Sequence, residues 1–101
     1  MEKCIFVYNP LSGKGKIARK EEYIKNKLKE KYEVEVYRSE FGGHIGQIIL
    51  EKAEGAKLIV VAGGDGTLNE AINGIANLKN KPKIGYIPSG TVNDVAHSLK
   101  I

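Results

Sequence analysis

The sequence predicts a three-layer α/β domain built on a parallel sheet of about four strands. Apolar runs of strand length alternate with amphipathic helical segments along the 101 residues. A glycine-rich turn follows each apolar run. Alternation of this kind indicates a parallel sheet with helices on both faces and right-handed crossovers. In such Rossmann-like sheets ligands bind at the carboxyl ends of the strands, so all four turns should share one edge.

The strands are predicted from short apolar runs rich in β-branched residues. They are Lys3–Tyr8, Val34–Tyr37, Leu58–Ala62 and Ile84–Ile87. Cys4 lies inside the first run, and a buried free cysteine usually acts as a small apolar core residue. A single cysteine cannot form an internal disulfide, which favours a reducing compartment.

The helices are predicted from apolar residues at helical spacing. They are residues 17–31, Ile45–Ala53, Leu68–Ala76 and Val92–Leu99. Thr67 and Glu70 have the spacing of a capping box, and Thr91 and Asp94 resemble one. By this interpretation the third and fourth helices would be capped by the two threonines.

The composition, 42% hydrophobic and 28% charged, is typical of a soluble globular protein. No apolar run approaches the ~20 residues of a membrane span, and the first is too short for a signal peptide. We therefore expect a cytoplasmic protein. Much of the net charge of +4 lies in Lys25–Lys31 and Lys79–Lys83. These are either solvated surfaces or contacts for anionic lipid or phosphate, whereas nucleic acid is disfavoured because no aromatic residues interleave.

The turn Gly63–Thr67, with the sequence GGDGT, separates the third apolar run from the next helix. Glycines let a ligand approach the main chain, and the helix N-terminus that follows attracts anions. These features predict a phosphate-binding turn. Asp65 adds a carboxylate, which could accept a proton from a hydroxyl or hold a metal-bound water. Helix capping alone is the structural alternative.

Other motifs are weaker. Walker A fails because Ile17 follows Gly15-Lys16, but residues 13–18 match G-x-G-x-x-A, with Glu40 as a candidate ribose-binding acid. A dinucleotide-binding module without catalysis therefore stays open. His44 could contact a phosphate or simply begin a helix, His97 is expected to be structural, and neither has the partners of a zinc site.

Three segments taken together resemble the diacylglycerol kinase catalytic domain. They are NPLSGKGK, GGDGTLNEAINGI and IPSGTVNDVAHSL, in this order. The resemblance implies the N-terminal fold of the NAD kinase and diacylglycerol kinase type. It also implies an enzyme that uses ATP and Mg²⁺ to phosphorylate a lipid hydroxyl, such as that of diacylglycerol. An NAD kinase-like enzyme is an alternative, since it shares GGDG.

The resemblance implies that Asp65 is the catalytic aspartate. It implies a nucleotide site formed by Asn9, Ser12, Gly13, Ser39, Gly63, Gly64, Asp65, Gly66, Thr67, Leu68, Asn69, Thr91 and Asn93. We assign no metal ligands within the chain, because in the family the magnesium-binding acids lie in a second domain.

Residues 1–101 are therefore expected to be a single nucleotide-binding domain, the N-terminal part of a longer two-domain lipid kinase. Such a chain should bind nucleotide and transfer little phosphoryl alone. Its partners would be ATP and lipid, with peripheral contact at the inner face of the membrane and a homodimer both compatible with the sequence.

Overall fold

The computed structural model describes residues 1–89, and the helix predicted over Val92–Leu99 lies outside them. One four-stranded sheet has the order β2-β1-β3-β4, and every neighbouring pair is parallel. This confirms the predicted α/β class. The elements are β1 (Lys3–Tyr8), η1 (Ser12–Gly15), α1 (Lys16–Arg19), α2 (Glu21–Lys29), β2 (Glu33–Arg38), α3 (His44–Lys52), β3 (Leu58–Gly63), α4 (Asp65–Ala76) and β4 (Lys83–Pro88).

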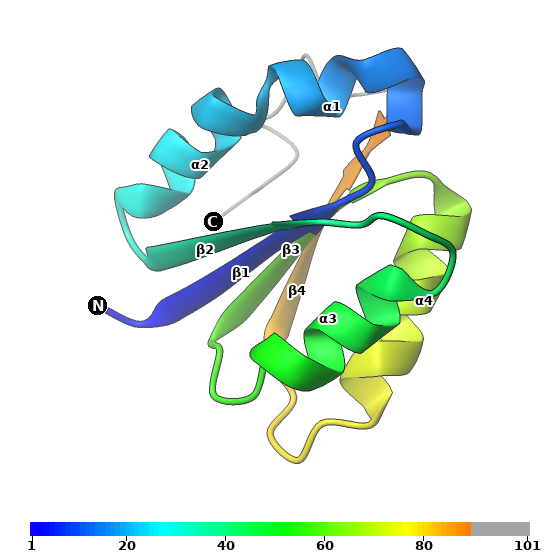
Figure 1. Ribbon diagram of the computed structural model, residues 1–101. Helices are drawn as coiled ribbons and strands as arrows, with labels where there is room; N and C mark the ends of the chain where they lie inside the picture. The colour runs from blue at the N-terminus through cyan, green and yellow to red at the C-terminus, as the bar shows by residue number, and fades with distance from the viewer. Residues whose placement is uncertain (90–101) are drawn as a thin grey trace.

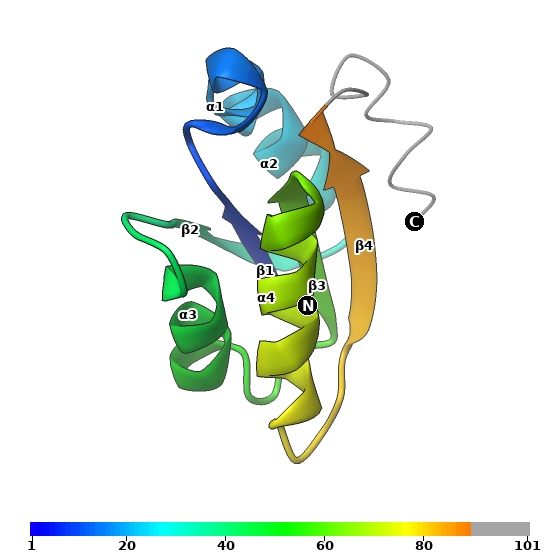
Figure 2. The same ribbon diagram turned by 90° about the vertical axis from the view of Figure 1, so that its right-hand side faces the viewer.

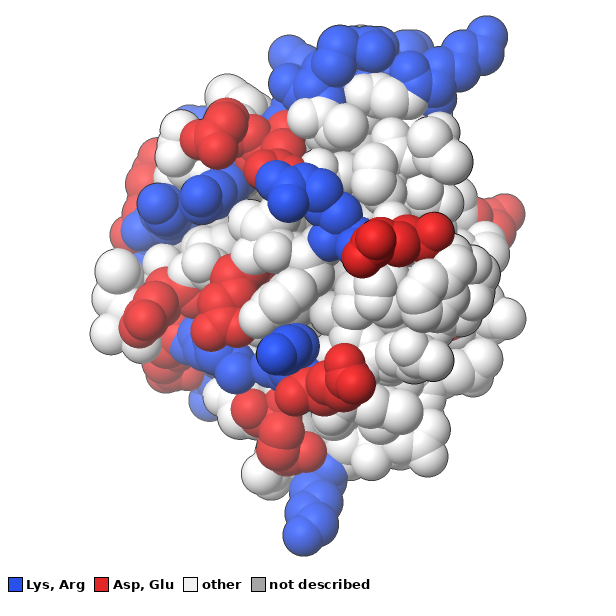
Figure 3. Space-filling model, viewed as in Figure 1, with Lys and Arg blue, Asp and Glu red and all other residues white. Residues whose placement is uncertain are grey.

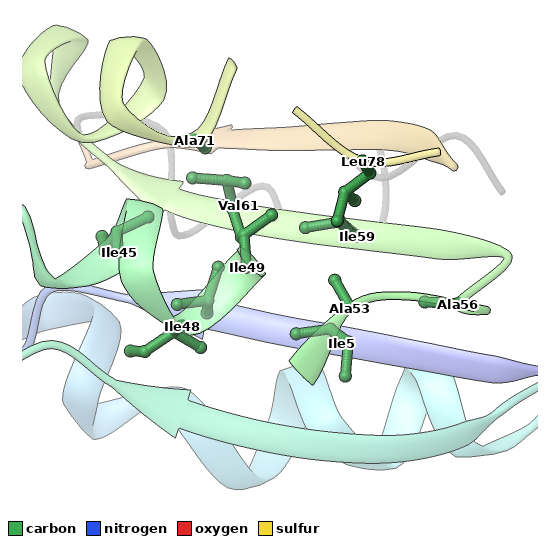
Figure 4. Packing of buried hydrophobic residues seen from close by; sticks show 11 residues of the cluster. Ile5, Ile45, Ile48, Ile49, Ala53, Ala56, Ile59, Val61, Ala71 and Leu78 are labelled. Atoms are coloured by element: carbon green, nitrogen blue, oxygen red, sulfur yellow. The ribbon is translucent and has the colours of Figure 1, made fainter. Parts of the chain in front are cut away.

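The helices form two layers, one on each face of the sheet (Figures 1 and 2). Residues of β1 alternate between the faces, as a strand requires. Cys4, Phe6 and Tyr8 pack with Ile17 and other residues of the α1–α2 side. The intervening β1 residues belong to the core on the α3–α4 side (Figure 4), whose members include Ile5, Val7, Ile45, Ile49, Val61 and Ala71.

The two central strands are the most buried part of the sheet. All six residues of β3 are buried, and β1 is buried from Cys4 to Tyr8. Cys4 is fully buried, as predicted, and burial raises the pKa of its thiol to about 12. The thiol is therefore a core group and not a nucleophile.

The predicted helix over residues 17–31 is interrupted at Lys20. There φ is −103° and ψ is 6°, and the chain forms two helices, α1 and α2. The charges on either side of Lys20 favour a break at this position. Arg19 lies in the last turn of α1, while Glu21 and Glu22 lie in the first turn of α2, each favourable for the nearby helix end.

Helix α4 begins at Asp65, earlier than predicted. Gly64 is the N-cap, and no side chain caps the helix by a hydrogen bond. The capping-box interpretation of Thr67 is therefore wrong. Thr67 is only 8% exposed because it packs inside the first turn, beside Gly63.

Helices α3 and α4 pack closely through two glycines. A Cβ on Gly74 would lie 3.2 Å from both the Cα and the carbonyl oxygen of Gly46. Within residues 1–89, no helix has the length and apolarity needed to cross a bilayer.

Candidate functional site

The candidate site lies at the carboxyl edge of the sheet, where the predicted turns meet. The order β2-β1-β3-β4 reverses the direction of chain progression between β1 and β3. Ligands of open parallel sheets bind outside such a switch point. The two segments that flank it are the turn after β1, residues 9–15, and residues 63–66, where β3 ends at Gly63 and α4 begins at Asp65.

The N-terminus of α4 presents open backbone at this edge. Asp65 and Gly66 are exposed, and a Cβ built on Gly64 or Gly66 would meet no atom within 4 Å beyond the neighbouring backbone. The Leu68 N–H donates to the Gly64 carbonyl at 3.1 Å, which closes the first helical turn. The N–H groups before Leu68 have no acceptor in the helix and carry its positive dipole end. This geometry suits a phosphate.

The preceding residue, Gly63, has a different role. Its φ is 153°, and a Cβ there would lie 2.8 Å from both the Cβ and Oγ1 of Thr67. Its carbonyl accepts a hydrogen bond of 3.0 Å from the Tyr86 hydroxyl of β4. Partial burial and, next, the negative charge of Asp65 raise the pKa of Tyr86. Tyr86 therefore holds the Gly63 backbone in place from the neighbouring strand β4, close to the Asp65 carboxylate.

The turn after β1 is wound tightly by left-handed residues. Gly13, Lys14 and Gly15 have φ values of 59°, 56° and 82°. A Cβ on Gly13 would lie 3.1 Å from the Ser89 Cβ, so this turn touches the start of the turn after β4. The Asn9 side chain accepts the Leu11 N–H at 2.9 Å and fixes the start of the turn.

A hollow of about 200 Å³ joins three of these segments. It contains two residues of the predicted nucleotide site, Asn9 from the first turn and Ser39 from the turn after β2. Glu70 reaches it from α4, and its remaining lining residues are Leu11, Glu40, Phe41 and Gly42. Leu11 is 85% exposed and Phe41 56% exposed, so two apolar side chains are available to a ligand here.

His44 supports the local structure of this hollow. Its Nδ1 accepts the Glu40 N–H at 2.9 Å, and its ring stacks on Phe41 with centroids 4.3 Å apart. The sequence left two roles open for His44, contact with a phosphate or the beginning of a helix, and the structure favours the second, at the start of α3.

A charged cluster fixes the strand ends beside the site. The Tyr8 hydroxyl donates to Glu21, and Arg38 forms an ion pair with Glu21 at 2.6 Å. Burial acts to raise the pKa of Glu21, but hydrogen bonds from Tyr8 and Arg38 outweigh it and lower that pKa. The cluster joins the last residues of β1 and β2 to the start of α2.

The predicted site residues are distributed over this edge. Ser12 lies in η1, while Leu68 and exposed Asn69 lie on α4. Thr91 and Asn93 fall outside the described residues. The sequence interpretation missed Tyr86, Leu11 and Phe41. Tyr86 could have been found from its position, because it carries a hydroxyl on the strand that neighbours Gly63, near the carboxyl edge of the sheet. The exposure of Leu11 and Phe41 depends on the conformations of their turns and could not be found in this way.

The described residues fit a nucleotide phosphate better than a protein-held metal. The space over Gly64 and Gly66 can admit an anion, and a single carboxylate, Asp65, lies in this turn. Mg²⁺ is usually held by one or two carboxylates together with substrate phosphates. Across residues 1–89, no group of three or more His, Cys, Asp or Glu side chains could form a metal cage.

Comparisons with known proteins agree on one family. A model of the diacylglycerol kinase catalytic domain matches residues 3–101. A diacylglycerol kinase of Staphylococcus aureus (strain bovine RF122 / ET3-1) is 45% identical over 105 residues, covering 99% of this chain and 32% of that protein. One from Staphylococcus haemolyticus (strain JCSC1435) is 43% identical over 107 residues, covering 100% and 32%. A crystal structure of a diacylglycerol kinase from Bacillus anthracis str. Sterne superposes with a TM-score of 0.76 at 31% identity, covering 86% and 32%.

Proposed function

Since the chain belongs to the diacylglycerol kinase catalytic domain family, we propose that it is the nucleotide-binding domain of an ATP-dependent lipid kinase. The chain spans about a third of the length of the relatives it matches. In the complete protein, the γ-phosphoryl group of ATP would pass to a lipid hydroxyl such as that of diacylglycerol. The acceptor pocket and further magnesium ligands would come from residues beyond this domain.

The open backbone at the start of α4 carries the proposal. Gly64 has φ −90° and ψ −173°, values that any L-residue can adopt, yet a Cβ there would meet no atom within 4 Å. The fold itself therefore does not require glycine at this position. A ligand that approaches the main chain closely would require it, and helix N-termini bind phosphates in this way.

The remaining predicted residues would complete the nucleotide site. Asn9 and Ser39 share one hollow with Glu70, so a nucleotide with its phosphates over Gly64 could extend along the edge into it. Magnesium, when bound with ATP, neutralises charge on the phosphates during transfer. Asp65 would either accept the proton of the acceptor hydroxyl, orient that hydroxyl or help hold the metal.

The alternatives have less support. For the dinucleotide-binding module, the helix that begins within the Gly13–Ala18 motif should hold the pyrophosphate. That helix, α1, has four residues and a weak dipole, whereas α4 has twelve. Family membership also favours a lipid kinase over an NAD kinase-like enzyme.

Calorimetric titration of the chain with MgATP and with NAD tests the proposal. We expect MgATP to bind and Gly64→Val to abolish binding without unfolding the protein. Gly85→Ala is the control, because its Cβ would make an ordinary 3.7 Å contact with Val60, away from the turn. NAD binding that is unaffected by Gly64→Val would move the site to Gly13–Ala18 and refute the proposal.

A further inference from the structure

A stacked pair of aromatic rings lies at the hollow on the carboxyl edge of the sheet. The centroids of the Phe41 and His44 rings are 4.3 Å apart, and the ring planes differ by 12°. His44 therefore covers one face of the Phe41 ring. The other face is open, because Phe41 is still 56% exposed and lines the hollow. An exposed aromatic ring held in this way offers a stacking surface to a second flat group.

The loop that carries Phe41 is closed by three hydrogen bonds. The Ser39 N–H donates to the Tyr8 carbonyl at 2.9 Å and continues the ladder between β2 and β1. The Glu40 N–H donates to His44 Nδ1 at 2.9 Å, and the His44 N–H donates to the Phe41 carbonyl at 3.1 Å. Phe41 is therefore pre-organised, so a group that stacks on it gains affinity because the loop needs no further ordering.

The charges around the hollow disfavour a phosphate group inside it. Glu40 and Glu70 supply two carboxylates to its lining, and no Lys or Arg is among the described residues that line it. Apart from Glu40, residues 39–50 contain no Lys, Arg, Asp or Glu. In Figure 3, Lys and Arg side chains gather over α1 at the top, whereas the side with α4 and the loop between β2 and α3 is largely white. The hollow therefore suits a neutral group that carries hydrogen-bond donors.

The size and position of the hollow suit one part of a nucleotide. Pockets that hold a whole drug-sized ligand measure about 300–1,000 Å³, and this hollow measures about 200 Å³. Glu70 reaches it from α4, five residues after Asp65, which corresponds to about 7.5 Å along the helix axis. A single ribose can bridge such a separation between a base and its phosphates.

We propose that Phe41 is a stacking platform for the base of the nucleotide and makes the site selective for purines over pyrimidines. The inference rests on the proposed function, because the phosphates of the same nucleotide would lie at the start of α4. A purine has two fused rings and covers more of the Phe41 ring than a pyrimidine does, so it gains more from stacking. Donors on the base, such as the exocyclic amine of adenine, would face the carboxylates of Glu40 and Glu70.

Calorimetric titration of Phe41→Ala tests the platform. The variant should bind MgATP roughly 5- to 150-fold more weakly than the unchanged chain, which is the range that stacking of a base on an aromatic ring provides. Inorganic triphosphate with Mg²⁺ should bind both proteins equally, because it has no base. MgUTP should bind the unchanged chain more weakly than MgATP, and Phe41→Ala should narrow that difference. Equal affinity of the unchanged chain for MgATP and MgUTP would overturn the proposal.

A fluorescent variant reports the stacking directly. The chain contains no tryptophan, so Phe41→Trp introduces a single indole at the platform, and a base stacked on it should quench its fluorescence. Tyr23→Trp is the matched control, because Tyr23 is an aromatic residue of α2 that is 46% exposed and does not line the hollow. MgATP should quench the first variant and not the second. Equal quenching of both, or equal quenching by inorganic triphosphate, would contradict stacking of the base.

Three results separate this proposal from the proposed function. MgATP binding that Phe41→Ala leaves unchanged overturns the platform alone. Quenching of Phe41→Trp by adenosine, with MgATP bound no more tightly than adenosine, supports the platform and refutes the phosphate site at α4. A chain that binds neither MgATP nor adenosine refutes both. Thermal unfolding of each variant verifies that lost binding does not reflect lost structure.

Discussion

Substituting Gly63 by alanine should destabilise the protein, whereas the same change at Gly64 should not. The Gly63 φ of 153° is one that L-residues rarely adopt, and forcing a side chain into such a conformation costs about 1–3 kcal/mol. The new Cβ would also lie 2.8 Å from the Cβ of Thr67, which is buried and cannot move freely. Overpacking of this kind costs about 1–3 kcal/mol. The expected total is about 2–6 kcal/mol.

Urea unfolding followed by circular dichroism measures the difference. Gly64→Ala is the internal control, because its backbone suits alanine and the added methyl meets no atom within 4 Å. It should change the free energy of unfolding by less than about 1 kcal/mol, because the poorer fit of alanine to the N-cap position opposes the restriction that alanine places on the unfolded chain. Equal stability of the Gly63→Ala and Gly64→Ala proteins would refute the assignment of Thr67 as the packing partner.

Three further outcomes are expected. Asp65→Asn should change the free energy of unfolding by no more than about 0.5 kcal/mol, because Asp65 is exposed. The same substitution should lower lipid phosphorylation by the complete protein at least ~100-fold, measured with radiolabelled phosphate. Tyr86→Phe removes the hydrogen bond to Gly63 and should cost about 0.5–1.5 kcal/mol of unfolding free energy, with weaker MgATP binding by calorimetry. The pKa of Glu21 is lowered in the folded state, so its contribution is present above the unfolded pKa and lost as pH falls through the folded one. Glu21→Gln should therefore flatten the acid limb of stability against pH, and an unchanged limb would contradict the role of the Arg38 pair.

The sheet could be predicted because its signals are local and mutually consistent. Every residue of β3 is buried, and a strand covered on both faces must be apolar throughout. Once the strands are parallel, the turns after them must share an edge, so the meeting of Asn9 and Ser39 in one hollow follows from topology. The strand order and register could not be predicted from the sequence, because the hydrophobic periodicity of the strands is the same for every possible order.

The predictions that failed concern places where two local signals compete. Thr67 has the chemistry of a cap, but its side chain is buried beside Gly63 and the helix begins earlier, at Asp65. Residues 17–31 have one helical period, but the charges around Lys20 favour an end and a new start. Capping and charge each contribute about 1 kcal/mol or less, so tertiary packing decides between such alternatives.

The glycines of GGDG look equivalent in the sequence, and the structure separates them. Gly63 is explained by the fold, since its φ and the proximity of Thr67 exclude a side chain. Packing does not require glycine at Gly64 or Gly66, because a Cβ at either would point into open space. Glycine inside a helix is less stable than alanine, and exposed Gly66, the second residue of α4, makes no packing contact that would offset this cost. A ligand that lies against the backbone supplies the missing reason. The two glycines that the fold does not need are therefore the stronger argument for a nucleotide at the start of α4.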